Sequence, residues 1–523
     1  MSDDATRGAP LNTAGGIASL RRDVCMRALG ARDPRFDGLF FVGITTTGIY
    51  CRPVCPARLS TPNRRRFFES AAAAERAGFR PCLRCRPELA PGRAVIDAVP
   101  RLARLATHRI AAGALNGRGV GDLARELGVS ERHLRRVLER EIGVSPVELA
   151  QTHRLLLAKQ LLADTTLPVT RIAYASGFQS LRRFNFVFRE RYRMSPSALR
   201  RGRRPEKAPR AEHGNELVRL TLAYRAPLAW DALLGVLTRE AIPGVEVVDR
   251  ARSRYRRTVR LEGRSGIILV EDAPAQARNP AKKHLNVDVA ATLLPVLMPL
   301  LARLRQLFDL DLEPLVVDAH LAQSGLADCV RERPGLRVPG ALEGFEVVLR
   351  ALLRERALVR RVVAALGEPL ETGAAGLTRL VPSAQRVADA GASFLMAQGV
   401  GRRCAEAMTT ASHAMASGAL RLEPGSDVAA TRRALLEIEG IGDRIASVIL
   451  MRALHWPDAF PASSRALRRQ TGVASSTALR VLAEQWRPWR AYAALHLELR
   501  ERRVRHAPNG QDIRAARLAS LVS

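Results

Sequence analysis

Two short cysteine motifs decide the fold of the N-terminal part of the chain: GIYCRPVCPAR at residues 48–58 and FRPCLRCRPE at residues 79–88. Three residues separate the cysteines of the first motif, and two separate those of the second. Two such close pairs can surround one zinc ion, because zinc prefers four thiolate or imidazole ligands in a tetrahedron. Prolines beside the cysteines stiffen both turns and reduce the entropy lost on ligation. Spacing alone leaves open whether such a site is reactive or purely structural, and most sites of this spacing are structural.

The residues around the two motifs favour a reactive site. ARDPRFDGLFFVGITTTGIYCRPVCPAR, at residues 31–58, together with the second motif, resembles the N-terminal zinc domain of the Ada protein over about residues 25–90. In that family the first cysteine of the quartet accepts a methyl group from a methylated phosphate in DNA. The resemblance therefore implies Cys51 as the methyl acceptor. It also implies a zinc site with the ligands Cys51, Cys55, Cys82 and Cys85.

The chemistry of a zinc-bound thiolate suits this role. The thiolate is the nucleophilic form of cysteine, and a bound zinc ion keeps it deprotonated at neutral pH. Four thiolates on one divalent cation carry a formal charge of about −2, and methylation of one sulfur changes it to about −1. Since DNA phosphates are negative, this change raises the affinity for DNA. We expect one methyl group to consume Cys51 once and to act as a switch.

Two helix-turn-helix (HTH) patterns follow, at residues 120–146 (VGDLARELGVSERHLRRVLEREIGVSP) and 169–196 (VTRIAYASGFQSLRRFNFVFRERYRMSP). Each has a turn glycine, apolar anchors at helical spacing and a final Ser-Pro, and a helix at about 146–162 is expected between them. Such a tandem resembles the DNA-binding domain of AraC-type regulators. Arginine and asparagine on the second helix of each unit are the residue types that contact bases and phosphates. The expected DNA-contacting residues are Arg132, Arg135, Arg136, Arg182, Asn185 and Arg189.

The C-terminal half contains a glycine-rich hairpin between two expected helices, LLEIEGIGDRIASVILMRAL at 435–454. Free backbone N–H groups at Gly440 and Gly442 can hold a DNA phosphate, as in a helix-hairpin-helix. With PDAFPASSRALRRQTG (457–472), this half resembles AlkA-type 3-methyladenine DNA glycosylases over about residues 215–505. These enzymes flip a damaged base out of the duplex and hydrolyse its glycosidic bond.

Two positions depart from the glycosylase pattern. The family's catalytic aspartate falls on Ser464, and a neutral hydroxyl cannot stabilise the positive charge that develops on the sugar. Loss of such a contribution lowers the rate by roughly 10²–10⁴. Upstream, Arg354 and Glu355 replace a glycine–glutamine pair of the family. We expect a glycosylase region with reduced activity that still binds DNA; a fully active bifunctional regulator and glycosylase is the alternative.

The composition agrees with a nucleic-acid partner. Lys and Arg total 83 against 51 Asp and Glu, a net charge of +32 over 523 residues. Such a surplus favours a polyanion, and length predicts several domains. There is no apolar run of about 18–20 residues and no signal-peptide pattern, so a cytoplasmic location without membrane contact is expected. Promoter DNA, damaged double-stranded DNA and RNA polymerase are the expected partners.

The sequence thus predicts a multidomain, mainly α-helical protein of the DNA alkylation response. A small four-cysteine α/β zinc module is expected first, then a helical tandem HTH domain, a linker, an α+β sheet domain and an all-α helix-hairpin-helix region. The expected bounds are 21–92, 95–200, 201–215, 216–300 and 301–505. A DNA-binding regulator whose zinc is only structural is a further possibility, which methyl uptake at Cys51 would exclude.

Overall fold

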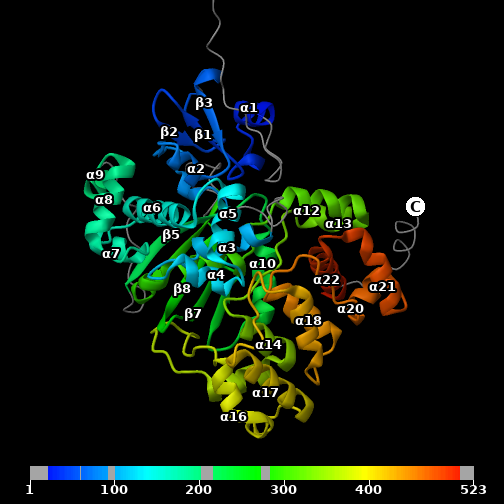
Figure 1. Cartoon of the computed structure of the whole chain (residues 1–523). Coiled ribbons are helices and arrows are strands. Elements are labelled where there is room, and N and C mark those ends of the chain that lie inside the picture. The colour runs from blue at the N-terminus through cyan, green and yellow to red at the C-terminus, as the bar shows by residue number, and fades with distance from the viewer. Residues whose placement is uncertain (1–21, 59, 92–100, 202–215, 273–282, 507–523) are drawn as a thin grey trace, which may run out of the picture. The chain divides into compact units, whose positions relative to one another are not determined.

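The computed structural model describes residues 22–58, 60–91, 101–201, 216–272 and 283–506 (Figure 1). The chain divides into two compact units. The first comprises Met1–Ala163 with Leu167–Arg204, and the second comprises Asp164–Thr166 with Pro205–Ser523. Apart from Arg201, the expected linker at 201–215 lies outside the described residues, as does the segment before Arg22. The protein is multidomain and mainly helical, as the sequence predicts.

The first unit begins with a four-stranded sheet in the order β3-β1-β2-β4. Its strands are β1 (Phe41–Ile44), β2 (Ile49–Cys51), β3 (Arg65–Phe68) and β4 (Arg80–Pro81). Around it lie α1 (Arg22–Ala31), α2 (Ala71–Arg76) and the 3-10 turns η1 (Pro34–Phe36), η2 (Pro62–Arg64) and η3 (Pro87–Leu89). The parallel pairing of β2 with β4 brings the two cysteine motifs together, and the backbone N–H of Cys82 donates to the carbonyl of Tyr50 at 2.9 Å.

The rest of the first unit is helical and contains both HTH motifs. Its helices are α3 (Arg101–Ala111), α4 (Val120–Glu126), α5 (Glu131–Ile142), α6 (Pro146–Asp164), α7 (Val169–Ala175), α8 (Leu181–Tyr192) and α9 (Pro196–Arg201). Ser130 and Ser180 cap α5 and α8 with their hydroxyl groups, which fixes where each recognition helix begins. The turn glycine Gly177 has φ +87°, and a Cβ there would lie 2.4 Å from the Asn116 side chain. The anchors Phe184 and Phe188 are fully buried, as their spacing predicts.

The second unit contains a five-stranded antiparallel sheet in the order β5-β9-β8-β7-β6. Its strands are β5 (Leu217–Ala223), β6 (Glu246–Asp249), β7 (Arg254–Leu261), β8 (Arg264–Asp272) and β9 (His284–Ala290), with α10 (Trp230–Glu240) between β5 and β6. The buried Arg257 of β7 pairs with both Glu246 and Glu346, so a satisfied ion network joins this sheet to the helices that follow.

Helices make up the remainder of the second unit. They are η4 (Ala291–Val296), α11 (Leu297–Leu307), α12 (Pro314–Leu321), the π-turn η5 (Ala322–Leu326), α13 (Ala327–Glu332), α14 (Gly344–Leu353), α15 (Arg356–Leu366), α16 (Ala384–Ala397), α17 (Arg402–Ala416), α18 (Val428–Glu437), α19 (Asp443–Arg452), α20 (Arg465–Thr471), α21 (Ser476–Ala483), η6 (Glu484–Trp486) and α22 (Arg490–His506). Two hydrophobic cores hold them: one centres on α14, α17 and α19, and the other on α20 and α22. Among the described helices, none is both long and apolar enough to cross a membrane.

Candidate functional sites

The four cysteines of the two motifs form one buried cluster. The sulfur atoms of Cys51, Cys55, Cys82 and Cys85 all lie within 4.8 Å of one another. A zinc ion with Zn–S bonds of about 2.3 Å needs a sulfur tetrahedron with edges of about 3.8 Å, which this arrangement fits. The donor set is all thiol, which is the softest set that zinc accepts in structural sites. The structure therefore brings together all four predicted ligands, and zinc is the metal they suit.

Backbone hydrogen bonds distinguish the sulfurs of the cluster. The N–H of Arg52 donates to the Cys85 sulfur at 3.4 Å, and the N–H of Arg84 donates to the Cys82 sulfur at 3.3 Å. Within the described part of the chain, no backbone N–H donates to the Cys51 sulfur. An N–H bond withdraws electron density from a thiolate and weakens it as a nucleophile. Cys51 therefore keeps more of its nucleophilic character than Cys82 or Cys85.

Close packing of four thiols also shifts their protonation. A hydrogen bond from Cys51 lowers the pKa of Cys55 to about 7 and lowers the pKa of Cys82 further. The hydrogen bond shared with Cys55 raises the pKa of Cys51 itself. Without a cation, the close packing of the four sulfurs therefore shifts their pKa values in opposite directions. A bound divalent cation would hold all four sulfurs as thiolates.

Charged side chains around the cluster support the two motifs. Arg52 donates to Asp37 and, at 3.1 Å, to the carbonyl of Cys85. Lys159 of α6 donates to the carbonyl of Cys82 at 3.2 Å and pairs with Glu88. The motifs themselves do not indicate these contacts. One signal was nevertheless available, because Lys159 is the only lysine in the first 200 residues of a chain that otherwise uses arginine.

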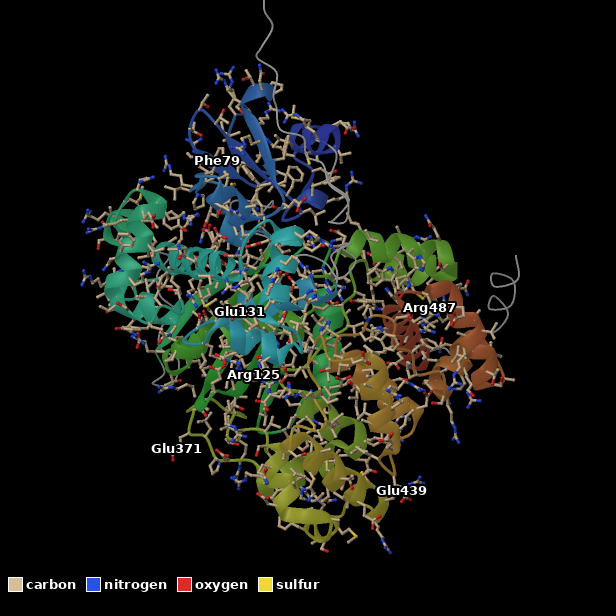
Figure 2. All side chains as sticks on the ribbon, viewed as in Figure 1. Phe79, Arg125, Glu131, Glu371, Glu439 and Arg487 are labelled. Atoms are coloured by element: carbon tan, nitrogen blue, oxygen red, sulfur yellow. The ribbon has the colours of Figure 1, made fainter. Side chains whose placement is uncertain are left out.

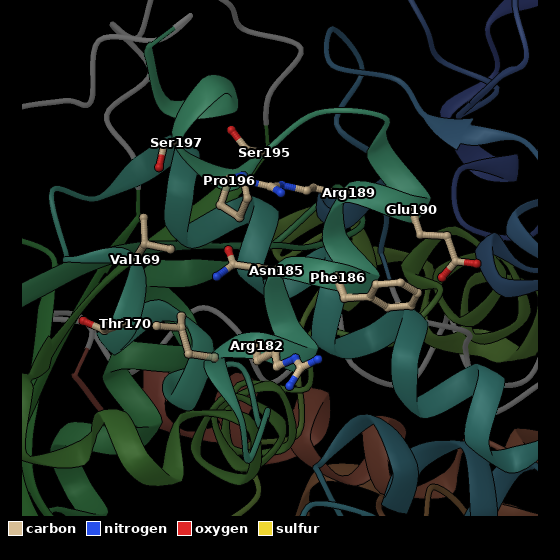
Figure 3. A pocket seen from close by; sticks show the side chains of 11 residues that line it. Val169, Thr170, Arg182, Asn185, Phe186, Arg189, Glu190, Ser195, Pro196 and Ser197 are labelled. Atoms are coloured by element: carbon tan, nitrogen blue, oxygen red, sulfur yellow. The ribbon is translucent and has the colours of Figure 1, made fainter.

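The predicted DNA-contacting side chains lie on the two recognition helices α5 and α8. Arg132 and Arg136 are exposed on α5, whereas Arg135 is half-buried and pairs with Glu131. On α8, the side chains of Arg182, Asn185 and Arg189 line a pocket of about 810 Å³ (Figure 3). The same pocket is lined by residues from the starts of α7 and α9: Val169, Thr170, Ser195, Pro196 and Ser197.

The pocket also contains the carboxylate of Glu190, but its two guanidinium groups, amide and hydroxyl groups suit a phosphate backbone or base edges. Phe186, also at this pocket, is 59% exposed and lies under Arg183, whose guanidinium carbon is 5.7 Å from the ring centre. The second HTH unit therefore presents a cationic surface with an aromatic side chain at its edge.

The glycine-rich hairpin joins α18 to α19, as expected. Gly440 has φ +93°, and a Cβ there would lie 2.9 Å from the Ala407 side chain, so only glycine fits. Gly442 caps α19 and has open space around its Cα. The backbone of the hairpin is therefore accessible at Gly442, where a phosphate could approach the helix N-terminus.

Ser464, where the resemblance implies the family's catalytic carboxylate, serves as a helix cap. It is 9% exposed and precedes α20, where its hydroxyl accepts from the backbone N–H of Leu467 at 3.4 Å. The carboxylate of Asp458, six residues before Ser464 in the chain, is held by two arginines. Arg490 holds it through two contacts of 2.6 and 2.8 Å, and Arg487 contacts it at 3.1 Å.

The two arginines that hold Asp458 differ in their exposure. Arg490 is only 15% exposed and pairs with Glu484 as well as Asp458, so its guanidinium stabilises the fold. Arg487 is 53% exposed (Figure 2) and can meet a ligand from solvent. Of the two, Arg487 is the better placed for DNA.

The second departure from the glycosylase pattern, at Arg354, coincides with an unusual backbone conformation. Arg354 follows α14 with φ +46°, in the left-handed region that favours glycine. The resemblance places a glycine there, so the backbone keeps a glycine-type conformation although the residue is arginine. Burial and the neighbouring charge of Arg354 together lower the pKa of Arg444 at the start of α19. Arg354 and Arg444 thus lie close enough for their positive charges to interact.

Three known families match separate parts of the chain. The metal-binding domain of Ada matches residues 24–88, a helix-turn-helix domain matches residues 123–202, and the AlkA N-terminal domain matches residues 219–343. These domains and the buried cysteine quartet define a zinc-binding, HTH-containing regulator that carries a DNA-glycosylase region.

Relatives from two species extend the comparison. A protein from Mycobacterium tuberculosis named probable bifunctional transcriptional activator/DNA repair enzyme AlkA is 36% identical over 90% of this chain and 95% of its own length. DNA-3-methyladenine glycosylase 2 of Escherichia coli is 31% identical over 53% of this chain and 95% of its own length. The bifunctional transcriptional activator/DNA repair enzyme Ada of the same species is 34% identical over 28% of this chain and 40% of its own length.

The chain belongs to the family of bifunctional transcriptional activator/DNA repair enzymes in which Ada-type domains are joined to an AlkA-type region. Its Ada-like regulatory domains and AlkA-like glycosylase domains make it a bifunctional protein of the DNA alkylation response.

Proposed function

We propose that this protein takes a methyl group from methylphosphotriesters in double-stranded DNA onto Cys51, once per molecule, and then acts as a transcriptional regulator. The main observation in support of the proposal is that the sulfurs of the buried quartet differ in the backbone hydrogen bonds that they accept. Cys82 and Cys85 accept backbone N–H bonds, and Cys51 accepts none from the described residues. Among these three ligands, Cys51 is therefore the strongest nucleophile once a metal has removed its proton.

The transfer balances as a single displacement. The Cys51 sulfur supplies an electron pair to the methyl carbon and forms an S–C bond, while the C–O bond to the phosphorus-bound oxygen breaks. The products are a thioether on Cys51 and an ordinary phosphodiester anion. Zinc held by the four cysteines would supply the acidity that keeps Cys51 a thiolate. Because a thioether is not turned back into a thiolate by any group near the site, the reaction happens once.

The tandem HTH domain supplies the regulatory half of the proposal. The pocket residues Arg182, Asn185 and Arg189 contact operator DNA, together with Arg132, Arg135 and Arg136 of the first unit. The formal charge of the metal site changes from about −2 to about −1 on methylation, and repulsion from DNA decreases. RNA polymerase is the partner we expect for activation, because the relatives are named transcriptional activators.

For the C-terminal half we propose DNA binding with weak base excision. Ser464 supplies no charge, and Asp458 is held by Arg487 and Arg490. Gly440 and Gly442 of the hairpin contact a phosphate through their backbone N–H groups. A fully active glycosylase is the second candidate, because a relative named DNA-3-methyladenine glycosylase 2 matches this half over 95% of its own length.

Transfer of labelled methyl from a methylphosphotriester duplex to the full chain tests the first proposal. We expect uptake by the zinc-loaded protein and by a Cys404→Ser control, whose half-buried thiol lies outside the quartet. Cys51→Ser is expected to lose uptake altogether. Uptake at the normal rate by Cys51→Ser would overturn the assignment.

A further inference from the structure

One face of helix α6 supports both pairs of cysteine ligands. Lys159 donates to the carbonyl of Cys82, a ligand of the second pair, at 3.2 Å. Seven residues earlier, the hydroxyl of Thr152 donates to Glu75 at 2.8 Å. Glu75 in turn accepts from the hydroxyl of Tyr50 at 3.0 Å, and Tyr50 directly precedes Cys51 of the first pair. Residues seven apart lie on the same face of an α-helix, two turns from one another.

The side chains that make these contacts are buried. Glu88 and Lys159 form an ion pair in which each side chain is 1% exposed. Glu75 and Thr152 are each 3% exposed, and Tyr50 is fully buried. Burial raises the pKa of Glu75, and contacts with Arg191, Thr152 and Tyr50 offset part of that effect. Buried polar groups persist only when their partners are in place, so these contacts are specific rather than incidental.

The choice of lysine at position 159 also supports a specific role for this side chain. The chain contains four lysines, Lys159, Lys207, Lys282 and Lys283, among 83 Lys and Arg residues. An ammonium group is compact and can donate in several directions, whereas a guanidinium needs a planar space. A carbonyl and a carboxylate that face the same buried point therefore suit lysine better than arginine.

We propose that α6, the helix between the two HTH units, is part of the support of the metal site, with Lys159 as its positioning residue. Lys159 holds the Cys82 loop and Glu88, and Thr152 holds the Cys51 strand through Glu75 and Tyr50. The cysteine quartet accordingly binds its metal at full affinity only while these contacts between the four-cysteine domain and α6 are intact. Groups behind metal ligands commonly change metal affinity by about 10–100-fold. This inference concerns metal retention and stands whichever cysteine accepts the methyl group.

Zinc release from the full chain to a chromogenic chelator at pH 7 tests the proposal. Lys159→Met removes the donor to Cys82 but leaves Glu88 charged, so we pair it with a Lys159→Met/Glu88→Gln variant. The glutamine of this double variant can still accept from Arg86, which donates to Glu88 at 3.0 Å in the native protein. We expect both variants to release zinc at least about 10-fold faster than the native protein.

The matched control is Arg125→Met, which removes an exposed cation of α4 in the same unit (Figure 2). It should release zinc at the native rate. A double variant that melts like the native protein and also releases zinc at the native rate would overturn the proposal.

Amide hydrogen exchange on the native chain provides a second test that needs no variant. Removal of zinc by chelation should increase exchange within α6 by several-fold, because α6 loses the partners of Thr152 and Lys159. Exchange in the hairpin helix α19 of the second unit should not change. Equal exchange of α6 in the zinc-loaded and zinc-free proteins would contradict the proposed support.

Discussion

The hydroxyl of Ser464 accepts a hydrogen bond from the backbone N–H of Leu467, with 3.4 Å between the oxygen and the nitrogen. The contact is that of a helix N-cap, a position at which serine and aspartate perform about equally. Position 464, where the resemblance implies a carboxylate, therefore caps α20 without a negative charge. A carboxylate could return to it with little change in the surrounding fold.

Ser464→Asp is expected to raise base excision. Aspartate keeps the cap and adds the charge that stabilises a developing sugar cation, so release of 3-methyladenine should increase by about 10²–10³. Release of free base from alkylated DNA measures the effect. Ser464→Asn is the matched control, because it caps the helix without a charge and should leave the rate unchanged. Robust release by the native protein, with no gain in Ser464→Asp, would show that another group supplies the charge.

Asp458→Asn is expected to destabilise the second unit without a specific effect on catalysis. The substitution leaves Arg490, which is 15% exposed, without its main charged partner. Breaking such a buried pair reduces the free energy of unfolding by about 3–5 kcal/mol. Urea denaturation measures the loss, and base release measured at equal folded fraction should not change. A drop in base release at full stability would instead assign Asp458 to the reaction.

The ion network of the sheet predicts how stability depends on pH. Despite burial, Arg350 and Arg257 lower the pKa of Glu246 to about 2. A carboxyl group whose pKa is lower in the folded state contributes stability at pH values above its unfolded pKa. That contribution decreases as the pH falls from about 4.5 toward 2.

Urea denaturation at several pH values checks this expectation. Glu246→Gln should be less stable than the native protein at pH 7 and should lose less further stability on acidification. If the free energy of unfolding fell equally with pH in the two proteins, Glu246 would not be the cause of the pH dependence.

Arg189→Ala is expected to weaken DNA binding through the pocket on α8. Loss of one phosphate contact should reduce the slope of log affinity against log salt concentration by about 1. Titration of a random-sequence duplex between low and moderate salt measures this slope. Arg125→Ala, on the exposed surface of α4, should keep the native slope, and an unchanged slope in Arg189→Ala would place Arg189 away from the phosphates.

Local patterns allowed the sequence to predict the cysteine cluster and both HTH motifs. Cysteine spacing and the turn at Gly177 depend on residues only a few positions apart. Their consequences therefore follow from backbone geometry and helical periodicity. The same holds for the hairpin, where only glycine fits at position 440.

The support of the metal site could not be predicted in this way. Lys159 meets Cys82 across 77 positions, and Thr152 meets Glu75 across 77 positions. Such contacts depend on how the module packs on α6, which no local pattern encodes. The pairing of Arg490 with Asp458 across 32 positions likewise depends on the fold.

The central claim is that a single sulfur, that of Cys51, accepts the methyl group. Substitution of a metal ligand can disturb the whole cluster, so the native protein gives the most direct test. Mass spectrometry of peptides from zinc-loaded full chain, after reaction with excess methylphosphotriester duplex, locates the added methyl group. Our account predicts one methyl group per chain, assigned by fragmentation of the peptide to the sulfur of Cys51. A methyl group on Cys55, Cys82 or Cys85 in place of Cys51, or no methylation of the quartet at all, would contradict it.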